Sequence, residues 1–269
     1  MWETIESKRF SEAINKVADS YSEKELLELL KDINLSEYVK NNTQKWKEHL
    51  NDLIEHDSTV REAVIYIVNN YLKKRKNNPE KFGRMHCIEA ASLMAEHWFN
   101  DSDEVAAALL HDVREDIPNW EEYLKATYNE KIVSLVKALT EKDKSWDSLE
   151  KKKLSRKERK LEEMEKVSIF TPKELALKLA DQISNIAETV NDLENMTLED
   201  RQKYWEQFNA GYDKQIWKYE TLSNIIETRI QECKEKNLFQ NEYEELRLKE
   251  FSNKFKYLVS KMKSLMESE

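Results

Sequence analysis

The scarcity of glycine and proline is the feature that most constrains how this chain can fold. Its 269 residues include only two glycines and three prolines. Strands joined by tight turns depend heavily on glycine, and short connections often use proline, so a sheet with many hairpins is disfavoured. Lysine, glutamate and leucine, which form helices readily, are abundant. The composition therefore predicts an all-α protein built from long helices.

Charge and apolar content narrow the possible classes of protein. The net charge is −9, whereas generic nucleic-acid binding depends on a basic surface, so we expect no such binding. No stretch approaches twenty uninterrupted apolar residues, and the first ten residues lack the basic and apolar regions of a secretory signal. Two cysteines, Cys87 and Cys233, make no disulfide framework. We therefore expect a soluble, cytoplasmic protein that makes no contact with membranes.

Two segments carry clear helix signals. The run EVAAALLHDVRED (104–116) predicts one helix, which should end before Pro118 because the residue preceding a proline avoids the α region. Further on, Thr171 is a predicted N-cap, with Pro172 at the first helical position and Glu174 at the third. The helix that begins there carries Asp181.

The adjacent pair His111-Asp112 follows the apolar run VAAALL, at the buried end of its predicted helix. Burying polar and charged groups is costly unless they have partners, and a metal ion is one such partner. His86 upstream and Asp181 downstream, both on predicted helices, could complete a set of two imidazoles and two carboxylates. Such a set suits Mn, Fe, Zn or Mg with open positions for water. The alternative is a core histidine beside an aspartate that merely reaches solvent.

Two further acids follow this pair by one helical turn. Glu115 stands four residues after His111, and Asp116 stands four residues after Asp112. This spacing puts each acid on the same helix face as its partner, where it could accept a proton from an attacking water. Asn185 stands four residues after the downstream aspartate, so its amide is predicted to project toward the same pocket.

Three segments around these residues resemble a known family. ALLHDVRED (108–116), ALTEKDK (138–144) and LALKLADQISNI (175–186) resemble the corresponding segments of RelA/SpoT hydrolase domains and of the free-standing small alarmone hydrolases. The resemblance covers roughly residues 60–230. It implies an HD-domain helical bundle at 61–230. The two ends of the chain have no counterpart in the resemblance, and their own sequences predict a helical N-terminal extension at 1–60 and a C-terminal helical extension at 231–269.

The resemblance also implies an activity and a set of roles. The activity is removal of the 3′-pyrophosphate from (p)ppGpp with Mn²⁺ as cofactor, which makes a nucleotide the expected substrate. Carried over by position, His86, His111, Asp112 and Asp181 are metal ligands, Glu115 and Asp116 activate water, and Asn185, Lys142, Lys144 and Arg84 contact the nucleotide.

Several positions depart from the family pattern, and they keep alternatives open. Cys87 stands where a proline usually follows the first histidine, and Gln182 and Ser184 replace an arginine and a histidine beside the downstream aspartate. These positions shape the nucleotide pocket rather than hold the metal. One alternative is therefore an HD phosphohydrolase acting on another nucleotide. Another is a catalytically silent HD scaffold that binds or regulates a partner. The terminal helices are candidates for forming a homo-oligomer.

A basic segment interrupts this acidic chain. KKKLSRKERK (151–160) has seven basic residues in ten and lies between the His111-Asp112 pair and Asp181. It could gather phosphate groups at the rim of the pocket, or it could be a solvated charged helix.

Overall fold

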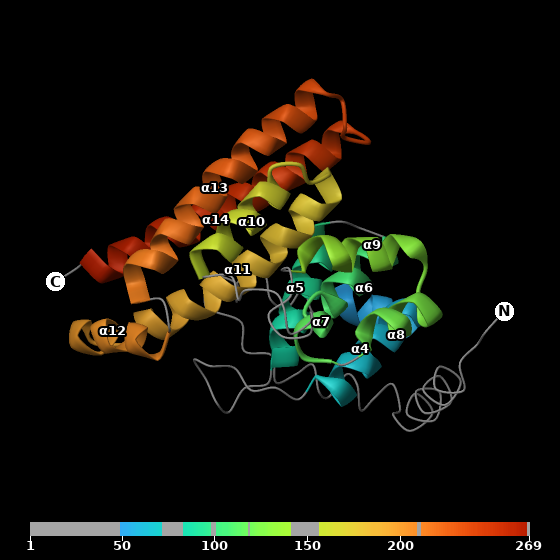
Figure 1. Cartoon of the computed structure of the whole chain (residues 1–269), viewed down its shortest axis with the longest axis horizontal. Coiled ribbons are helices and arrows are strands. Elements are labelled where there is room, and N and C mark those ends of the chain that lie inside the picture. The colour runs from blue at the N-terminus through green and yellow to red at the C-terminus, as the bar shows by residue number, and fades with distance from the viewer. Residues whose placement is uncertain are drawn as a thin grey trace. The chain divides into compact units, whose positions relative to one another are not determined.

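The computed structural model describes residues 49–71, 83–97, 101–117, 119–140, 156–208 and 211–267. The side chains of Glu96, His97, Glu115, Asp116, Arg156 and Gln207 are outside this description. All regular elements among the described residues are helices, which confirms the predicted all-α fold (Figure 1). None of the helices in these ranges has the length and apolar character needed to cross a membrane.

The chain divides into two units, Met1–Lys137 and Ala138–Glu269. The division falls inside the segment 61–230 that the sequence suggests as one domain, and the predicted boundaries at 60 and 230 stay predictions. Each unit is described by itself below.

The first unit is built around a short, apolar helix, α6. Residues Val105–Leu110 of this helix are all buried, and three of them are alanines, which allow neighbouring helices to approach closely. Helices α4 and α5 both pack against it. The helices of this unit are α4 (Ser58–Asn70), α5 (Gly83–His97), α6 (Ser102–Leu110), α7 (Val113–Asp116), α8 (Trp120–Thr127) and α9 (Glu130–Leu139), the last of which crosses the boundary.

The structure breaks the helix that the sequence predicts over 104–116. Helix α6 ends at Leu110, His111 and Asp112 form a turn, and α7 begins at Val113. The two residues of the pair therefore lie between helices rather than within one. The prediction of one continuous helix over 104–116 was therefore wrong, whereas the predicted placement of the Glu115 and Asp116 side chains beside the pair stays a prediction.

The second unit is dominated by three long helices. Helix α11 packs along α14, which forms a hairpin with α13, and α10 contacts α13. In Figure 1 these helices run alongside one another in yellow, orange and red. The hairpin turns at residues 236–241. The elements are α10 (Arg156–Val167), α11 (Pro172–Glu194), α12 (Leu198–Tyr204), the 3-10 helix η1 (Trp205–Gln207), α13 (Gly211–Glu235) and α14 (Glu242–Glu267).

Helix α11 begins with the capping box that the sequence predicts. The Thr171 hydroxyl oxygen accepts from the Glu174 backbone N–H at 3.4 Å, and the Glu174 carboxylate accepts from the Thr171 N–H at 2.7 Å. Arg229 of α13 fixes the preceding turn by donating to the Phe170 carbonyl at 2.8 Å. The start of the helix that carries Asp181 is thus held both locally and by a distant helix.

We expect Thr171→Ala to lower the free energy of unfolding by about 1 kcal/mol, because one N-terminal N–H loses its acceptor. The melting temperature should fall by roughly 2–4 °C for a chain of this size. Thermal denaturation followed by circular dichroism measures the change. Thr171→Ser keeps the hydroxyl and should melt like the wild type, and equal losses in both variants would contradict the capping role.

Candidate metal centre

Two buried histidines face each other in the first unit. His86 of α5 is 3% exposed and His111 is 4% exposed. Their Nε2 atoms lie 3.2 Å apart, and the rings meet edge to face at 77° with centroids 5.0 Å apart. Two buried nitrogens therefore converge on one point, although 25 residues separate them in the chain.

A backbone contact selects the tautomer of His111. Its Nδ1 lies 2.7 Å from the carbonyl oxygen of Ala108, so Nδ1 carries the proton and donates it. The Nε2 lone pair is then directed toward His86. Histidine ligands commonly have this arrangement, in which a carbonyl holds one ring nitrogen and the other binds metal.

Asp112 adds a carboxylate to the two histidines. Its Oδ1 lies 3.3 Å from His111 Nε2, and the side chain is 26% exposed, so the cluster opens toward solvent on this side. The Tyr71 hydroxyl donates to the other oxygen, Oδ2, at 3.4 Å. One potential ligand atom from each of His86, His111 and Asp112 lies within 4.8 Å of the others.

The spacing of these donors fits a shared divalent ion. Two nitrogens bound to one ion at about 2.0–2.1 Å each, at tetrahedral or octahedral angles, stand about 2.8–3.4 Å apart. The observed 3.2 Å between the His86 and His111 nitrogens lies in this range. In the absence of an ion, the same contact is a hydrogen bond from the His86 Nε2–H to the His111 lone pair. Two imidazoles and a carboxylate suit Mn, Fe or Zn, so the residues present fit the expected metal.

Gly83 makes room for the tyrosine that holds Asp112. A Cβ atom at position 83 would lie 2.8 Å from both Cζ and the hydroxyl oxygen of Tyr71. The Tyr71 side chain is buried, so the ring has little freedom to move away. Neither residue stands out in the sequence, because their contact joins the end of α4 to the start of α5.

We expect Gly83→Ala to weaken Mn²⁺ binding by about tenfold or more, because the displaced Tyr71 no longer orients Asp112. Titration of the metal-free protein with Mn²⁺ by calorimetry measures the affinity. Tyr71→Phe should weaken binding less, since the ring stays in place. Gly211→Ala is the control, because its added methyl group meets no atom within 4 Å even though φ there is +65°. Wild-type affinity in both Gly83→Ala and Tyr71→Phe would contradict the role of Tyr71.

Asp181 lies on α11 in the second unit, where both oxygens of its carboxylate accept hydrogen bonds. Asn185 donates to Oδ1 at 2.7 Å, while Oδ2 accepts from Gln182 at 2.6 Å and from Lys178 at 3.0 Å. Only 9% of the residue is exposed. Asn185 and Asp181 thus form a direct hydrogen bond between their side chains, and the projection of Asn185 toward the pocket of the His111-Asp112 pair stays a prediction.

Lys178 links Asp181 to a wider charge network. Its Nζ lies 2.6 Å from Glu163 Oε1 on α10, and Glu163 Oε2 accepts from Lys160 at 2.7 Å. Burial alone would lower the pKa of Lys178, but the carboxylates of Asp181 and Glu163 raise it, so the ammonium stays charged. Burial would likewise raise the pKa of Glu163, but the charges of Lys178, Lys218 and Lys160 lower it. The network is a chain of ionised groups that ends on Asp181.

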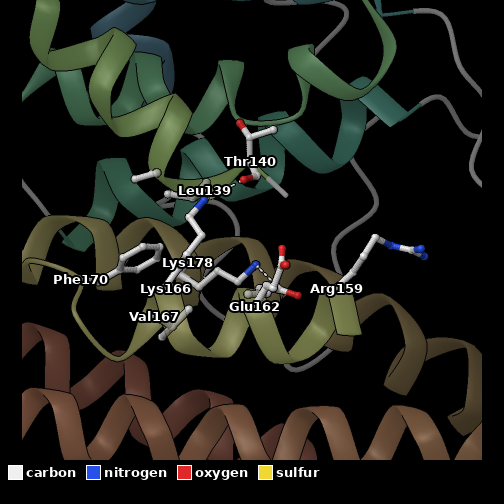
Figure 2. A pocket seen from close by; sticks show the side chains of 10 residues that line it. Leu139, Thr140, Arg159, Glu162, Lys166, Val167, Phe170 and Lys178 are labelled. Carbon is white, nitrogen blue, oxygen red and sulfur yellow. Dashed lines mark hydrogen bonds and ion pairs between the residues drawn. The ribbon is translucent and has the colours of Figure 1, made fainter. Parts of the chain in front are cut away.

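A pocket lies beside this network within the second unit (Figure 2). Leu139, Val167 and Phe170 supply apolar walls, and Arg159, Glu163 and Lys178 are among the charged groups that line it. The Lys166 ammonium donates across it to the Thr140 carbonyl at 2.9 Å, as the dashed line in Figure 2 shows. Arg159 belongs to the basic segment 151–160, of which residues 156–160 are described.

The structure describes only some of the other residues that the sequence suggests for the site. Arg84 donates to the carbonyl of Val68 on α4 at 2.6 Å, so its guanidinium ties α5 to α4. Glu115 and Asp116 belong to α7, but their side chains lie outside the described part of the chain. Lys142 and Lys144 lie wholly outside it. The sequence singled out neither Tyr71 nor Glu163. Lys178 was noted only as part of the segment LALKLADQISNI (175–186), with no role of its own.

The sequence and the structure were compared with known protein families and known proteins. Residues 63–208 match the model of the HD domain. A crystal structure of lmo0812 from Listeria monocytogenes EGD-e is similar at 26% identity and a TM-score of 0.49, with 65% of this chain and 99% of that chain covered. A metazoan ortholog of SpoT, which hydrolyses ppGpp and plays a role in starvation responses, is similar at 22% identity and a TM-score of 0.49, covering 73% and 95% of the two chains. No curated protein sequence gives a significant match.

Proposed function

Because the chain belongs to the HD domain family of metal-dependent phosphohydrolases, we propose that it removes the 3′-pyrophosphate from a (p)ppGpp-like alarmone. The observation that carries the proposal is the buried contact of 3.2 Å between His86 and His111, with Asp112 beside it. The segments ALLHDVRED and LALKLADQISNI, which resemble alarmone hydrolases, support the choice of substrate.

The proposed metal ligands are His86, His111, Asp112 and Asp181, and the proposed ion is Mn²⁺. When bound, the ion activates water and polarises the phosphoryl group. The Tyr71 hydroxyl donates a hydrogen bond to one oxygen of Asp112. The carboxylate of Asp181 accepts hydrogen bonds from Lys178, Gln182 and Asn185. These contacts fix the orientation of both carboxylates before substrate binds, which is what a hydrolytic site requires.

The chemical step is an in-line attack of water on the phosphorus next to the 3′-oxygen. A new P–O bond forms as the bond between phosphorus and the ribose 3′-oxygen breaks. We assign Glu115 and Asp116 to accept the proton of the water, and the ribose leaves as a 3′-hydroxyl after it takes up a proton. Asn185, Lys142, Lys144 and Arg84 are proposed to contact the nucleotide.

Hydrolysis assays of the full chain with Mn²⁺ test this proposal. The panel contains ppGpp, ppApp, NADPH, nucleoside mono- and triphosphates and cyclic dinucleotides. We expect release of pyrophosphate from ppGpp. Absence of turnover on every member, with metal shown to be bound, would contradict the enzymatic function and favour a binding or regulatory scaffold.

A second candidate function is hydrolysis of another nucleotide by the same metal chemistry. It is favoured by Gln182, which replaces the arginine usual in alarmone hydrolases and donates to Asp181 at 2.6 Å. A neutral amide held in this way supplies less positive charge to a phosphorylated substrate. Turnover of another panel member, with none of ppGpp, would select this candidate.

A further inference from the structure

Lys178 is a buried ammonium that two carboxylates on different helices share. Its side chain is 6% exposed, and its Nζ lies 2.6 Å from Glu163 Oε1 and 3.0 Å from Asp181 Oδ2. Glu163 belongs to α10 and Asp181 to α11, and residues 168–171 join the two helices. The shorter of the two distances is the one to Glu163, so the ammonium is drawn toward α10 and is not held by Asp181 alone.

Glu163 is itself fixed through both oxygens of its carboxylate. Its Oε2 accepts from Lys160, three residues earlier on α10, at 2.7 Å, while Oε1 contacts Lys178. The Glu163 side chain is 9% exposed, so water competes little for these contacts. Interactions between charges are stronger away from water. The position of the Lys178 ammonium therefore decides how much of the negative charge of each carboxylate it offsets.

The charge of Asp181 matters because a divalent cation is attracted by a carboxylate whose charge is not already offset. Contacts around a metal ligand tune its affinity for the ion in this way. If Glu163 were neutral, Asp181 would be the remaining carboxylate partner of Lys178 among the described residues. The ammonium would then pair with Asp181 one to one and would oppose a cation at the same carboxylate.

We propose that Glu163 is a positioning residue for the metal ligand Asp181. It draws the Lys178 ammonium toward α10 and so leaves Asp181 the negative charge that a divalent ion needs. This role rests on the proposed function, in which Asp181 is one of the metal ligands. Glu163 acts through Lys178 and is assigned no contact with the ion or with the substrate.

Calorimetric titration of the metal-free full chain with Mn²⁺ tests this role. Glu163→Gln should weaken Mn²⁺ binding by about tenfold, the lower end of the loss expected when a residue that supports a metal ligand is changed. Glu165→Gln is the matched control, because it removes an exposed carboxylate from the same helix, and it should bind Mn²⁺ like the wild type. Wild-type affinity in Glu163→Gln would overturn the proposal.

A second substitution separates the positioning role from a loss of packing. Adding Lys178→Met to Glu163→Gln should recover most of the lost affinity, because no ammonium is left to offset the charge of Asp181. The Asp181 carboxylate keeps its hydrogen bonds from the amides of Gln182 and Asn185 in this double variant. A purely structural role predicts the opposite result, in which the double variant binds Mn²⁺ no better than Glu163→Gln, and that result would overturn the proposal.

Glu163→Asp supplies the comparison if the double variant does not fold. It keeps the negative charge on α10 and should bind Mn²⁺ more tightly than Glu163→Gln does. Equal weakening by Glu163→Asp and Glu163→Gln would contradict a role that depends on this charge.

Asp181→Asn distinguishes a failure of this role from a failure of the proposed function. It should weaken Mn²⁺ binding at least as much as Glu163→Gln does. Weakening by Asp181→Asn alone, with wild-type affinity in Glu163→Gln, would overturn the role of Glu163 and leave the ligand set intact. Wild-type affinity in Asp181→Asn would overturn both. The predicted affinities in a chain that hydrolyses no member of the nucleotide panel would support the role of Glu163 and contradict only the proposed activity.

Discussion

Asp112→Ala should abolish metal binding and phosphohydrolase activity together. The variant removes the carboxylate that lies 3.3 Å from His111 Nε2, and with it the acceptor of the Tyr71 hydroxyl. Loss of a residue that only orients a ligand costs about 10–100-fold in metal affinity, so loss of a ligand should cost more. Turnover should fall below about one-thousandth of the wild-type rate, because the activation that the ion supplies is lost. Mn²⁺ titration and hydrolysis rates on the same preparations measure both effects.

Glu115→Gln is the matched control for this prediction. It keeps the size of the side chain and removes its negative charge at a position assigned to water rather than to metal. The variant should bind Mn²⁺ like the wild type and turn over more slowly, by about 10²–10⁴-fold if Glu115 is the base. Full activity in Asp112→Ala would show that the metal centre has been assigned to the wrong residues.

Lys178→Met should cause the largest loss of stability among these variants. It removes the buried ammonium that lies 2.6 Å from Glu163 and 3.0 Å from Asp181. Glu163 then keeps only Lys160 of these two lysines, and Asp181 keeps the amides of Gln182 and Asn185. Breaking a buried ion pair by removing one partner costs about 3–5 kcal/mol, because the remaining charge is uncompensated. For a chain of this length we expect a drop of about 10 °C in melting temperature. Differential scanning calorimetry measures it.

A surface ion pair provides the control. Lys203 contacts Glu199 at 2.7 Å on α12, but both side chains are largely exposed. Lys203→Met should therefore change stability by less than about 1 kcal/mol. Adding Glu163→Gln to Lys178→Met should restore part of the loss, since it removes one of the two buried carboxylates that have lost the Lys178 ammonium. Equal melting temperatures for Lys178→Met and Lys203→Met would contradict the network.

Local signals in the sequence predict local structure well in this chain. The low glycine and proline content predicts helices throughout, and the described residues bear this out. The capping box at Thr171 is also confirmed, because it depends on side chains only three residues apart.

Features that depend on contacts between distant residues were not predictable in this way. The turn at His111-Asp112 interrupts a segment with strong helix propensity. The Tyr71–Asp112 contact joins residues 41 apart, and no periodicity in the sequence indicates it. The link from Lys178 to Glu163 joins two helices. The sequence shows Lys178 only as part of LALKLADQISNI and Glu163 only as part of a charge-rich run. The resemblance to a family suggested which residues matter, but not which neighbours hold them.

Metal dependence of hydrolysis is the most direct test of the central claim that the cluster of His86, His111 and Asp112 is a catalytic metal centre. Metal-free protein is titrated with Mn²⁺ while nucleotide hydrolysis and bound metal are measured together. We predict no activity without metal, activity that rises in proportion to bound Mn²⁺, and loss of both in His111→Ala. Undiminished hydrolysis by the metal-free protein, or full metal-dependent activity in His111→Ala, would contradict the account.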